Sequence, residues 1–196
     1  MLTLRQLDND SETIIRLIAK TFEGVTPSPS RPWNSRVVLG CWAAKFLPLV
    51  HHYMPDYPIT HIGFSTTYAR QFFEIPNVSF NMLLPVLQGP GGRKFIRDAH
   101  LRERPVFAWT VNAETRMEWC IRRELDGVIT DDPKLFIDVC DKYDESKPER
   151  WMTIGQLLDA LRVWLFALVL GSYYRRRFER RIQIQPQLLR DDKRDT

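Results

Sequence analysis

The sequence predicts an α/β fold in which parallel strands are joined by helical crossovers. Short apolar or β-branched runs alternate with segments of helical character, and consecutive runs begin at intervals of roughly 17 to 29 residues. Antiparallel hairpins would need much shorter links, and several runs are almost continuously apolar, as strands covered on both faces are. The chain has 196 residues, whereas an eight-stranded β/α barrel usually needs about 250. The spacing therefore predicts a barrel-like but incomplete arrangement.

The first expected element is an amphipathic helix over residues 8–22, which has an apolar face of helical period and can be capped by Asp8, Asn9, Asp10 or Ser11. A glycine and a proline-rich run break it. Five strands are then expected at 37–42, 59–65, 77–81, 105–111 and 126–130. Helices are expected at 43–54, 66–75, 93–103, 113–124 and 133–143.

A second region is expected after an α/β domain of residues 1–144. Residues 145–150 are a polar linker, residues 151–181 an apolar helix that associates with a membrane, and residues 182–196 a disordered charged tail. Aromatic rings suited to a membrane interface occur in the helix, and arginines that would attract anionic headgroups follow it.

The uncharged part of this helix, residues 163–174, is too short to span a bilayer unaided. As a helix it covers roughly 18 Å, against a hydrocarbon core of about 30 Å. Extending the helix back to Trp151 adds Asp159 and Arg162, and a charge is costly near the bilayer centre. A shallow membrane anchor is therefore predicted, with a buried core helix and a true span as the alternatives.

The net charge of +4 arises from 28 basic and 24 acidic residues. Residues 175–196 hold eight basic and four acidic side chains, so the remaining chain is neutral. A nucleic-acid-binding face needs Lys and Arg clustered on the fold itself, so no nucleic-acid partner is expected; RNA binding by the arginine-rich tail is the alternative. The three cysteines, widely spaced and odd in number, favour a reducing compartment, and no signal peptide is recognisable. An intracellular, non-secreted protein is expected.

Two segments contain residue types that could form a site. His51, His52, Asp56 and His61 are metal ligands by type, but adjacent histidines point apart on a helix or a strand, and histidines also suit the C-terminal end of a helix. The glycine-rich segment 88–95 could hold a phosphate, but it lacks P-loop spacing. A dipole-stabilised helix end and a plain loop are the favoured interpretations.

The most informative segments are PVFAWTVN, residues 105–112, and ELDGVITDDP, residues 124–133. Each is a strand followed by polar residues, and one helix separates the two. The carboxyl ends of such strands open on the same side of a parallel sheet, where the active sites of barrels lie. The two segments resemble the paired C-terminal signatures of the glycerophosphodiester phosphodiesterase family, whose last two barrel strands end in a WTVN-type and a DGVITDxP-type sequence.

The resemblance extends over about residues 7–143, through VVLGCW, HIGFSTTYARQFFE and MLLPVLQGPGGRKFIRDAHLRERP. In this longer form the chain is similar to the fungal branch described as phosphatidylglycerol phospholipase C, in which an apolar C-terminal segment also follows the barrel. The resemblance implies the C-terminal portion of a TIM-type (β/α) barrel of the phospholipase C-like phosphodiesterase kind, followed by an apolar helix and a basic tail. It implies hydrolysis of phosphoric diesters of glycerophospholipids such as phosphatidylglycerol, with a glycerophospholipid or a membrane surface as the partner.

The chemical groups of the family do not carry over onto this chain. Complete members are expected to use a histidine pair in acid/base catalysis and carboxylates that hold a divalent cation, Mg²⁺ or Ca²⁺. These groups come from an HRG-type strand, an ExD pair, a later histidine and an acid-x-Lys sequence. The chain contains no HRG and no ExD pair in the N-terminal position of the family motif, and Leu4 and Gln6 occupy the acid and lysine positions. No catalytic residue, metal ligand or cofactor is expected, and the chain is predicted to be inactive alone.

Only Trp109 and Asn112 carry over, as substrate-binding residues at the wall of the pocket. Trp109 would pack against the glycerol or acyl part of a substrate, or else fill the core, whereas Asp131 and Asp132 are expected to cap the next helix, with Pro133 in its first turn. The front half of the barrel is expected to be missing, either from the gene model or from the gene. The alternative function is a non-catalytic, membrane-associated pseudoenzyme or interaction protein, and the exposed edges of an incomplete barrel favour self-association.

Overall fold

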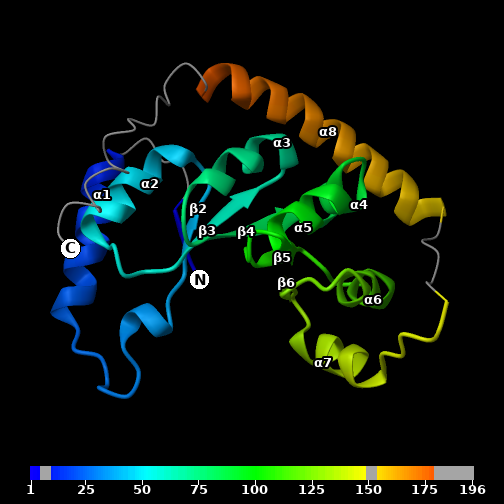
Figure 1. The fold of residues 1–196 in the computed structure, drawn as a ribbon, viewed down its shortest axis with the longest axis horizontal. Helices are drawn as coiled ribbons and strands as arrows, with labels where there is room; N and C mark the ends of the chain where they lie inside the picture. Colours follow the sequence, from blue (N-terminus) through cyan, green and yellow to red (C-terminus); the bar gives the residue numbers. More distant parts are fainter. Residues whose placement is uncertain (5–9, 149–153, 179–196) are drawn as a thin grey trace. The chain divides into compact units, whose positions relative to one another are not determined.

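The structure, a computed structural model, describes residues 1–4, 10–148 and 154–178. Strands and helices alternate along these residues, as the sequence predicts (Figure 1). The strands are β1 (Leu2–Leu4), β2 (Leu39–Cys41), β3 (Ile59–Gly63), β4 (Val78–Leu83), β5 (Val106–Trp109) and β6 (Gly127–Ile129). The helices are α1 (Ser11–Gly24), α2 (Leu47–Tyr53), α3 (Thr66–Ala69), α4 (Leu84–Gln88), α5 (Gly92–His100), α6 (Glu114–Arg122), α7 (Pro133–Lys142) and α8 (Ile154–Phe178), with 3₁₀ turns at Trp33–Ser35, Ala44–Phe46 and Arg70–Glu74.

The described residues fall into two compact units. The first contains Met1–Ile59 and the end of α8 from Tyr173, and the second contains Thr60–Ser172. The candidate substrate-binding residues all lie in the second unit. The domain limits expected from the sequence place one domain over residues 1–144, and those limits stay a prediction.

The first unit is built on the parallel pair of β1 and β2, in which Leu4 lies opposite Cys41. The α1 helix begins after Asp10, whose side chain accepts a hydrogen bond from the Thr13 amide at 2.9 Å. Asp10 thus caps α1, one of the caps expected from the sequence. Apolar side chains of both strands, α1 and α2 form one core: Leu4, Ile15, Ala19, Leu39, Cys41, Ala43, Phe46, Val50 and Met54.

The second unit has the strand order β3–β4–β5–β6. The β5 strand pairs in parallel with β4 and with β6, so that Leu83, Trp109 and Ile129 stand side by side at the strand ends. Parallel neighbours need crossover connections, and the helices between consecutive strands supply them. The arrangement confirms an α/β fold with parallel strands.

An aromatic cluster between β4 and α5 forms part of the second core. The ring of Phe80 lies 5.1 Å from that of Phe95 and 5.2 Å from that of Phe73, both edge-on. The Arg70 guanidinium covers the cluster and pairs with Asp98 at 2.6 Å. The hydrogen bond from Arg70 holds the pKa of Asp98 below its usual value, so the pair stabilises the fold at neutral pH and weakens as the pH falls toward that lowered pKa.

Two elements of the structure are absent from the sequence expectation. The β1 strand has only three residues, and its short apolar run precedes the expected helix. The α4 helix follows β4 directly, because Pro85 stands in its first turn and suits a helix start. In the sequence, the apolar residues of α4 follow those of β4 without a break, so the two elements could not be told apart.

The α8 helix lies within residues 151–181, for which the sequence predicts an apolar, membrane-associating helix, and that character stays a prediction. Residues 151–153 and 179–181 lie outside the described residues, as does the expected tail at 182–196. In the described part of the chain, no helix has both the length and the apolar character required to cross a membrane. Ala160 and Ala167 of α8 are buried, and the Trp164 ring lies against Gly89. The helix therefore packs on the second unit along one side.

Replacing Gly92 by alanine should destabilise the protein by about 2 kcal/mol or more, as overpacking in tight sites does. A β-carbon at this position would stand 1.9 Å from the backbone oxygen of Leu87, which cannot move without disturbing α4. Urea unfolding measures the change. Gly155→Ala is the matched control because it is also a helical glycine but has open space around it. It should be neutral or slightly stabilising, and equal loss in both variants would contradict the close approach at Gly92.

In the native protein, Cys140 should be the one thiol that reacts rapidly with a thiol reagent at pH 8. Cys140 is exposed, whereas burial raises the pKa of Cys41 and of Cys120 to about 12. Since the thiolate is the reacting form, both buried groups are almost wholly unreactive at that pH. Absorbance titration with and without denaturant gives the count, and rapid labelling of all three thiols in the native protein would refute the packing around Cys41 and Cys120.

Candidate functional site

The candidate site lies where β5 and β6 end. The polar residues that follow these strands are brought together because the strands are parallel and in register, with Trp109 opposite Ile129. Pairing continues past β5, since the Val111 amide donates to the Ile129 carbonyl at 2.9 Å. The segments that carry Asn112 and Asp131 therefore lie next to each other, as the sequence predicts.

Asn112 is the centre of a hydrogen-bond network at these strand ends. Its amide nitrogen donates to Oδ2 of Asp131 at 2.6 Å, and its amide oxygen accepts from the Asp131 backbone amide at 3.0 Å. The same oxygen accepts from the Thr130 hydroxyl at 3.1 Å. Both ends of the side-chain amide are thus engaged with the segment after β6. Through these contacts Asn112 holds the segment that follows β6 in position.

Asp132 begins α7 in the way expected of a capping residue. Its Oδ1 accepts a hydrogen bond from the Leu135 amide at 2.9 Å, and Pro133 occupies the first turn. The Asp132 backbone amide is held by the Thr130 hydroxyl at 3.1 Å. The expected capping role is confirmed for Asp132, whereas Asp131 binds Asn112 instead of the α7 amides.

Trp109 is half-buried at the end of β5 and is fixed through its indole nitrogen. This nitrogen donates to the backbone oxygen of Asn81 at 3.0 Å. The peptide bond between Trp109 and Thr110 is cis. With its nitrogen bonded to β4, the ring is held as a partly exposed apolar wall beside the Asn112 network.

Sequence reasoning missed two residues of this neighbourhood. The Thr130 hydroxyl joins Asn112 to Asp132, and Asn81 supplies the carbonyl that holds Trp109 while its own side chain is 2% exposed. A signal for Asn81 was present, since VSFNMLL places one amide among mostly apolar residues, and a buried polar side chain is uncommon.

The histidines weighed as metal ligands are spread over different environments. His51 and His52 are exposed in the last turn of α2, which is a favourable place for a histidine without any ligand. His61 is buried on β3, and its ring stacks on that of Phe72 with centroids 4.1 Å apart. His61 thus belongs to the aromatic packing of the second unit.

The glycine-rich segment 88–95 connects two helices. Gly91 has a positive φ of 82° and forms the N-cap of α5, while Gly92 allows α4 and α5 to approach closely. Arg93 and Lys94 are exposed. The segment is a tight interhelical turn rather than a strand-to-helix loop of the P-loop kind.

The described residues do not fit a divalent-cation site. Within that part of the chain, no three side chains of His, Cys, Asp or Glu lie close enough together to hold a metal ion. The two carboxylates at the strand ends already accept hydrogen bonds, Asp131 from Asn112 and Asp132 from the Leu135 amide of α7. A cation needs several oxygen ligands, which Asp131 and Asp132 in these positions do not supply.

A family model described as the glycerophosphoryl diester phosphodiesterase family matches residues 7–135. The chain belongs to this family. A search of the curated proteins finds no match. The family assignment confirms the resemblance carried by WTVN and DGVITDDP, whereas the similarity to the fungal phospholipase C branch stays a prediction.

Solved structures of phosphodiesterases share the fold. A protein from Silicibacter pomeroyi assigned as a glycerophosphoryl diester phosphodiesterase has a TM-score of 0.57 and 16% identity over 71% of this chain and 50% of its own. A glycerophosphodiester phosphodiesterase from Parabacteroides distasonis has a TM-score of 0.57 and 15% identity, over 71% of this chain and 55% of its own. An Oleispira antarctica phosphodiesterase, solved with its product sn-glycerol-3-phosphate, has a TM-score of 0.60 and 13% identity, over 72% of this chain and 54% of its own.

The chain spans about half the length of these solved structures. At these identities the likeness concerns the fold, and it agrees with an α/β architecture that forms part of a TIM-like barrel. The glycerophosphodiester phosphodiesterase family and this coarser fold were both predicted from the sequence.

Substituting Asn112 by alanine should lower the free energy of unfolding by about 2 kcal/mol, because three hydrogen bonds are lost and one is made by a charged carboxylate. Chemical denaturation measures the loss. Asp138→Ala on α7 is a matched control, an exposed polar side chain of the same unit. It should change stability by less than about 0.5 kcal/mol. A value for Asn112→Ala as small as that of the control would show that the network does not hold the segment after β6.

Proposed function

We propose that the chain is the C-terminal portion of a phosphodiesterase barrel that hydrolyses the phosphoric diester of glycerophospholipids such as phosphatidylglycerol, as its similarity to the fungal phospholipase C branch implies. The family assignment supports the reaction class. The Asn112 network beside Trp109 carries the proposal, because it lies at the strand ends where barrel enzymes have their active sites.

Each residue at the strand ends has a distinct proposed task. The partly exposed Trp109 ring offers an apolar surface for the glycerol or acyl part of a lipid, and its bond to Asn81 keeps the ring in one orientation. Asn112 uses both ends of its amide within the protein, so its proposed part is to position the wall rather than to contact the phosphate. Neither residue can transfer a proton at neutral pH.

The proposed reaction therefore draws its chemical groups from outside this chain. In the family a divalent cation neutralises the charge that develops on the phosphoryl oxygens. The described residues do not fit such a cation, and no catalytic histidine carries over from the family motifs. The chain contributes part of the pocket wall, and we propose that it is inactive alone.

The strand count supports an incomplete barrel. A closed barrel of this type has eight parallel strands, and the described residues supply six. Two strand–helix units would complete the ring, and the HRG and ExD motifs of the family belong to such N-terminal units. A barrel portion that lacks such units would expose strand edges, which favour association with another polypeptide or with a second copy.

The proposed substrate resides in membranes, so the proposal includes action at a membrane surface. Aliphatic side chains of α8 that are exposed along its length support this part of the proposal. A non-catalytic, membrane-associated pseudoenzyme or interaction protein is the alternative. The two functions differ in whether completing the barrel restores turnover.

The purified chain should release no diacylglycerol from phosphatidylglycerol with Mg²⁺ or Ca²⁺, because it lacks both the cation ligands and the acid/base pair. A chimera in which the N-terminal strand–helix units of the Oleispira antarctica phosphodiesterase, through its acid-x-Lys strand, replace residues 1–6 should hydrolyse a water-soluble glycerophosphodiester such as glycerophosphoglycerol. Release of glycerol 3-phosphate is the readout. Turnover by the unmodified chain would overturn the inactivity, and a folded chimera without turnover would favour the non-catalytic alternative.

The wall residues are tested within the chimera. Trp109→Ala should raise KM about tenfold, since a buried aromatic contact of this size stabilises a ligand by about 1.5 kcal/mol. Trp119→Ala is unsuitable as a control because that ring is buried in the core, so Phe107→Leu, a half-buried substitution on the same strand, serves instead. An unchanged KM in Trp109→Ala would assign the ring to packing alone.

A further inference from the structure

The α8 helix contacts the second unit along a narrow line of side chains. Ala160 and Ala167 stand one heptad apart, on the same face, and are 7% and 5% exposed. Between them, Trp164 lies so close to Gly89 that a β-carbon there would stand 2.5 Å from its Cδ1. The helix runs beside α4 (Figure 1). One side of α8 is therefore fixed to the protein.

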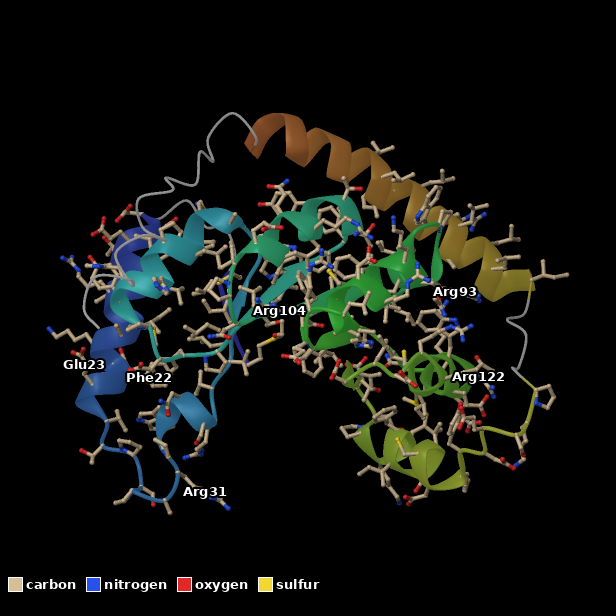
Figure 2. The ribbon with its side chains drawn as sticks, viewed as in Figure 1. Phe22, Glu23, Arg31, Arg93, Arg104 and Arg122 are labelled. Carbon is tan, nitrogen blue, oxygen red and sulfur yellow. The ribbon has the colours of Figure 1, made fainter. Side chains whose placement is uncertain are left out.

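The side of α8 that adjoins this contact line is aliphatic. Figure 2 shows side chains that stand off the outer side of the helix. Those we call the aliphatic stripe are Ile154, Leu157, Leu158, Leu161, Leu165, Leu168 and Val169. Each is between 48% and 79% exposed. Folded proteins seldom leave so many neighbouring aliphatic side chains in water, and such patches mark binding surfaces.

The width of the aliphatic stripe distinguishes between the surfaces that could cover it. At about 100° per residue, the stripe from Leu157 to Val169 covers an arc of about 120°. A coiled-coil partner needs only the narrower seam of alternating three- and four-residue steps, with charged side chains beside it. In α8, Leu157 and Val169 widen the seam on both sides. A broad apolar arc is typical of a helix that lies in a lipid interface.

Charge in the sequence points to the kind of lipid. Five uncharged residues after Val169 an arginine run begins, made of Arg175, Arg176, Arg177, Arg180 and Arg181, with Glu179 as the one acidic residue among them. A run of arginines next to an apolar helix is attracted by anionic headgroups. In a parallel pair of two copies the same runs would be brought together and would repel, since like charges at close range are unfavourable.

We propose that the aliphatic stripe of α8 is a membrane-binding face, which lies in the plane of a bilayer whose anionic headgroups attract the arginine-rich sequence that follows. The contact line of Ala160, Trp164 and Ala167 holds the neighbouring side of the helix to the second unit, so that the stripe itself stays open to the membrane. The inference rests on the membrane association in the proposed function and specifies the face, the helix orientation and the lipid charge.

Flotation of the full chain with lipid vesicles tests the proposal. Vesicles of phosphatidylcholine with a fraction of phosphatidylglycerol should bind the wild-type chain, and pure phosphatidylcholine vesicles should bind it more weakly. The double variant Leu158→Gln with Leu165→Gln should bind the anionic vesicles about tenfold or more weakly, because two exposed leucines can no longer enter the apolar layer. Glutamine is a good helix former, so α8 should be retained.

The matched control carries Leu101→Gln with Ile137→Gln. These residues are also exposed and aliphatic, 76% and 59% exposed, but lie on α5's C-terminal cap and on α7. The control should float like the wild type. Equal binding by both double variants would overturn the stripe as the membrane-binding face, and equal binding of wild type to neutral and anionic vesicles would overturn the assigned lipid charge.

Two further measurements keep the outcome clear. Circular dichroism verifies that the variants fold, and a triple variant that changes the stripe residues Leu161, Leu165 and Leu168 to alanine provides a helix-favouring substitute if the glutamine variant unfolds. Light scattering without lipid should find the same oligomeric state in wild type and stripe variants. The wild-type chain could instead form a dimer that the stripe variants do not form, and bind no vesicles. That result would overturn the proposal and show that the stripe binds a second copy of the chain. Turnover of the soluble glycerophosphodiester by the chimera reports on the proposed function independently.

Discussion

Parallel pairing of β5 with both of its neighbours is the constraint on which the candidate site depends. Because Trp109 stands level with Leu83 on one side and Ile129 on the other, three strands finish at the same height. Side chains that are far apart along the chain then meet just beyond that level. A shift of one residue in either register would turn every side chain of the shifted strand to the other face of the sheet and would separate Asn112 from Thr130 and Asp131.

The sequence predicts those parts of the architecture that depend on residues close together along the chain. Alternating apolar runs and helical stretches predict the strand–helix order, and the Asp-Pro pair at 132–133 predicts the start of α7 because a cap acts within one turn. The β1 strand could not be predicted in this way, because three residues are too few to show the alternation of apolar and polar side chains that marks a strand. The α4 helix could not be predicted because its apolar residues directly continue those of β4. In such an unbroken apolar run, the sequence pattern does not show where the strand ends and the helix begins.

Other contacts join residues that no local pattern connects. The bond between the Trp109 indole and the Asn81 carbonyl depends on the mutual alignment of two strands, and the contact of Trp164 with Gly89 depends on where α8 packs. Recognition of the family motifs nevertheless pointed to the candidate site, since WTVN and DGVITDDP mark the ends of two strands that the structure places side by side. A signature of this kind identifies the scaffold, whereas chemistry belongs to particular side chains. In this chain the two are separable: the residues proposed as the pocket wall are present, and Asp131 and Asp132 at the strand ends are engaged in structural bonds.

The contact between the Trp164 ring and Gly89 joins two positions that are 75 residues apart in the sequence. The indole occupies the volume that a methyl group at position 89 would need, so the identity of one residue restricts the other during evolution. Relatives that carry a larger side chain at the position of Gly89 should have a smaller residue in place of the tryptophan, or a C-terminal helix that docks elsewhere. Covariation between these two columns would therefore trace which family members keep their last helix against the body of the protein.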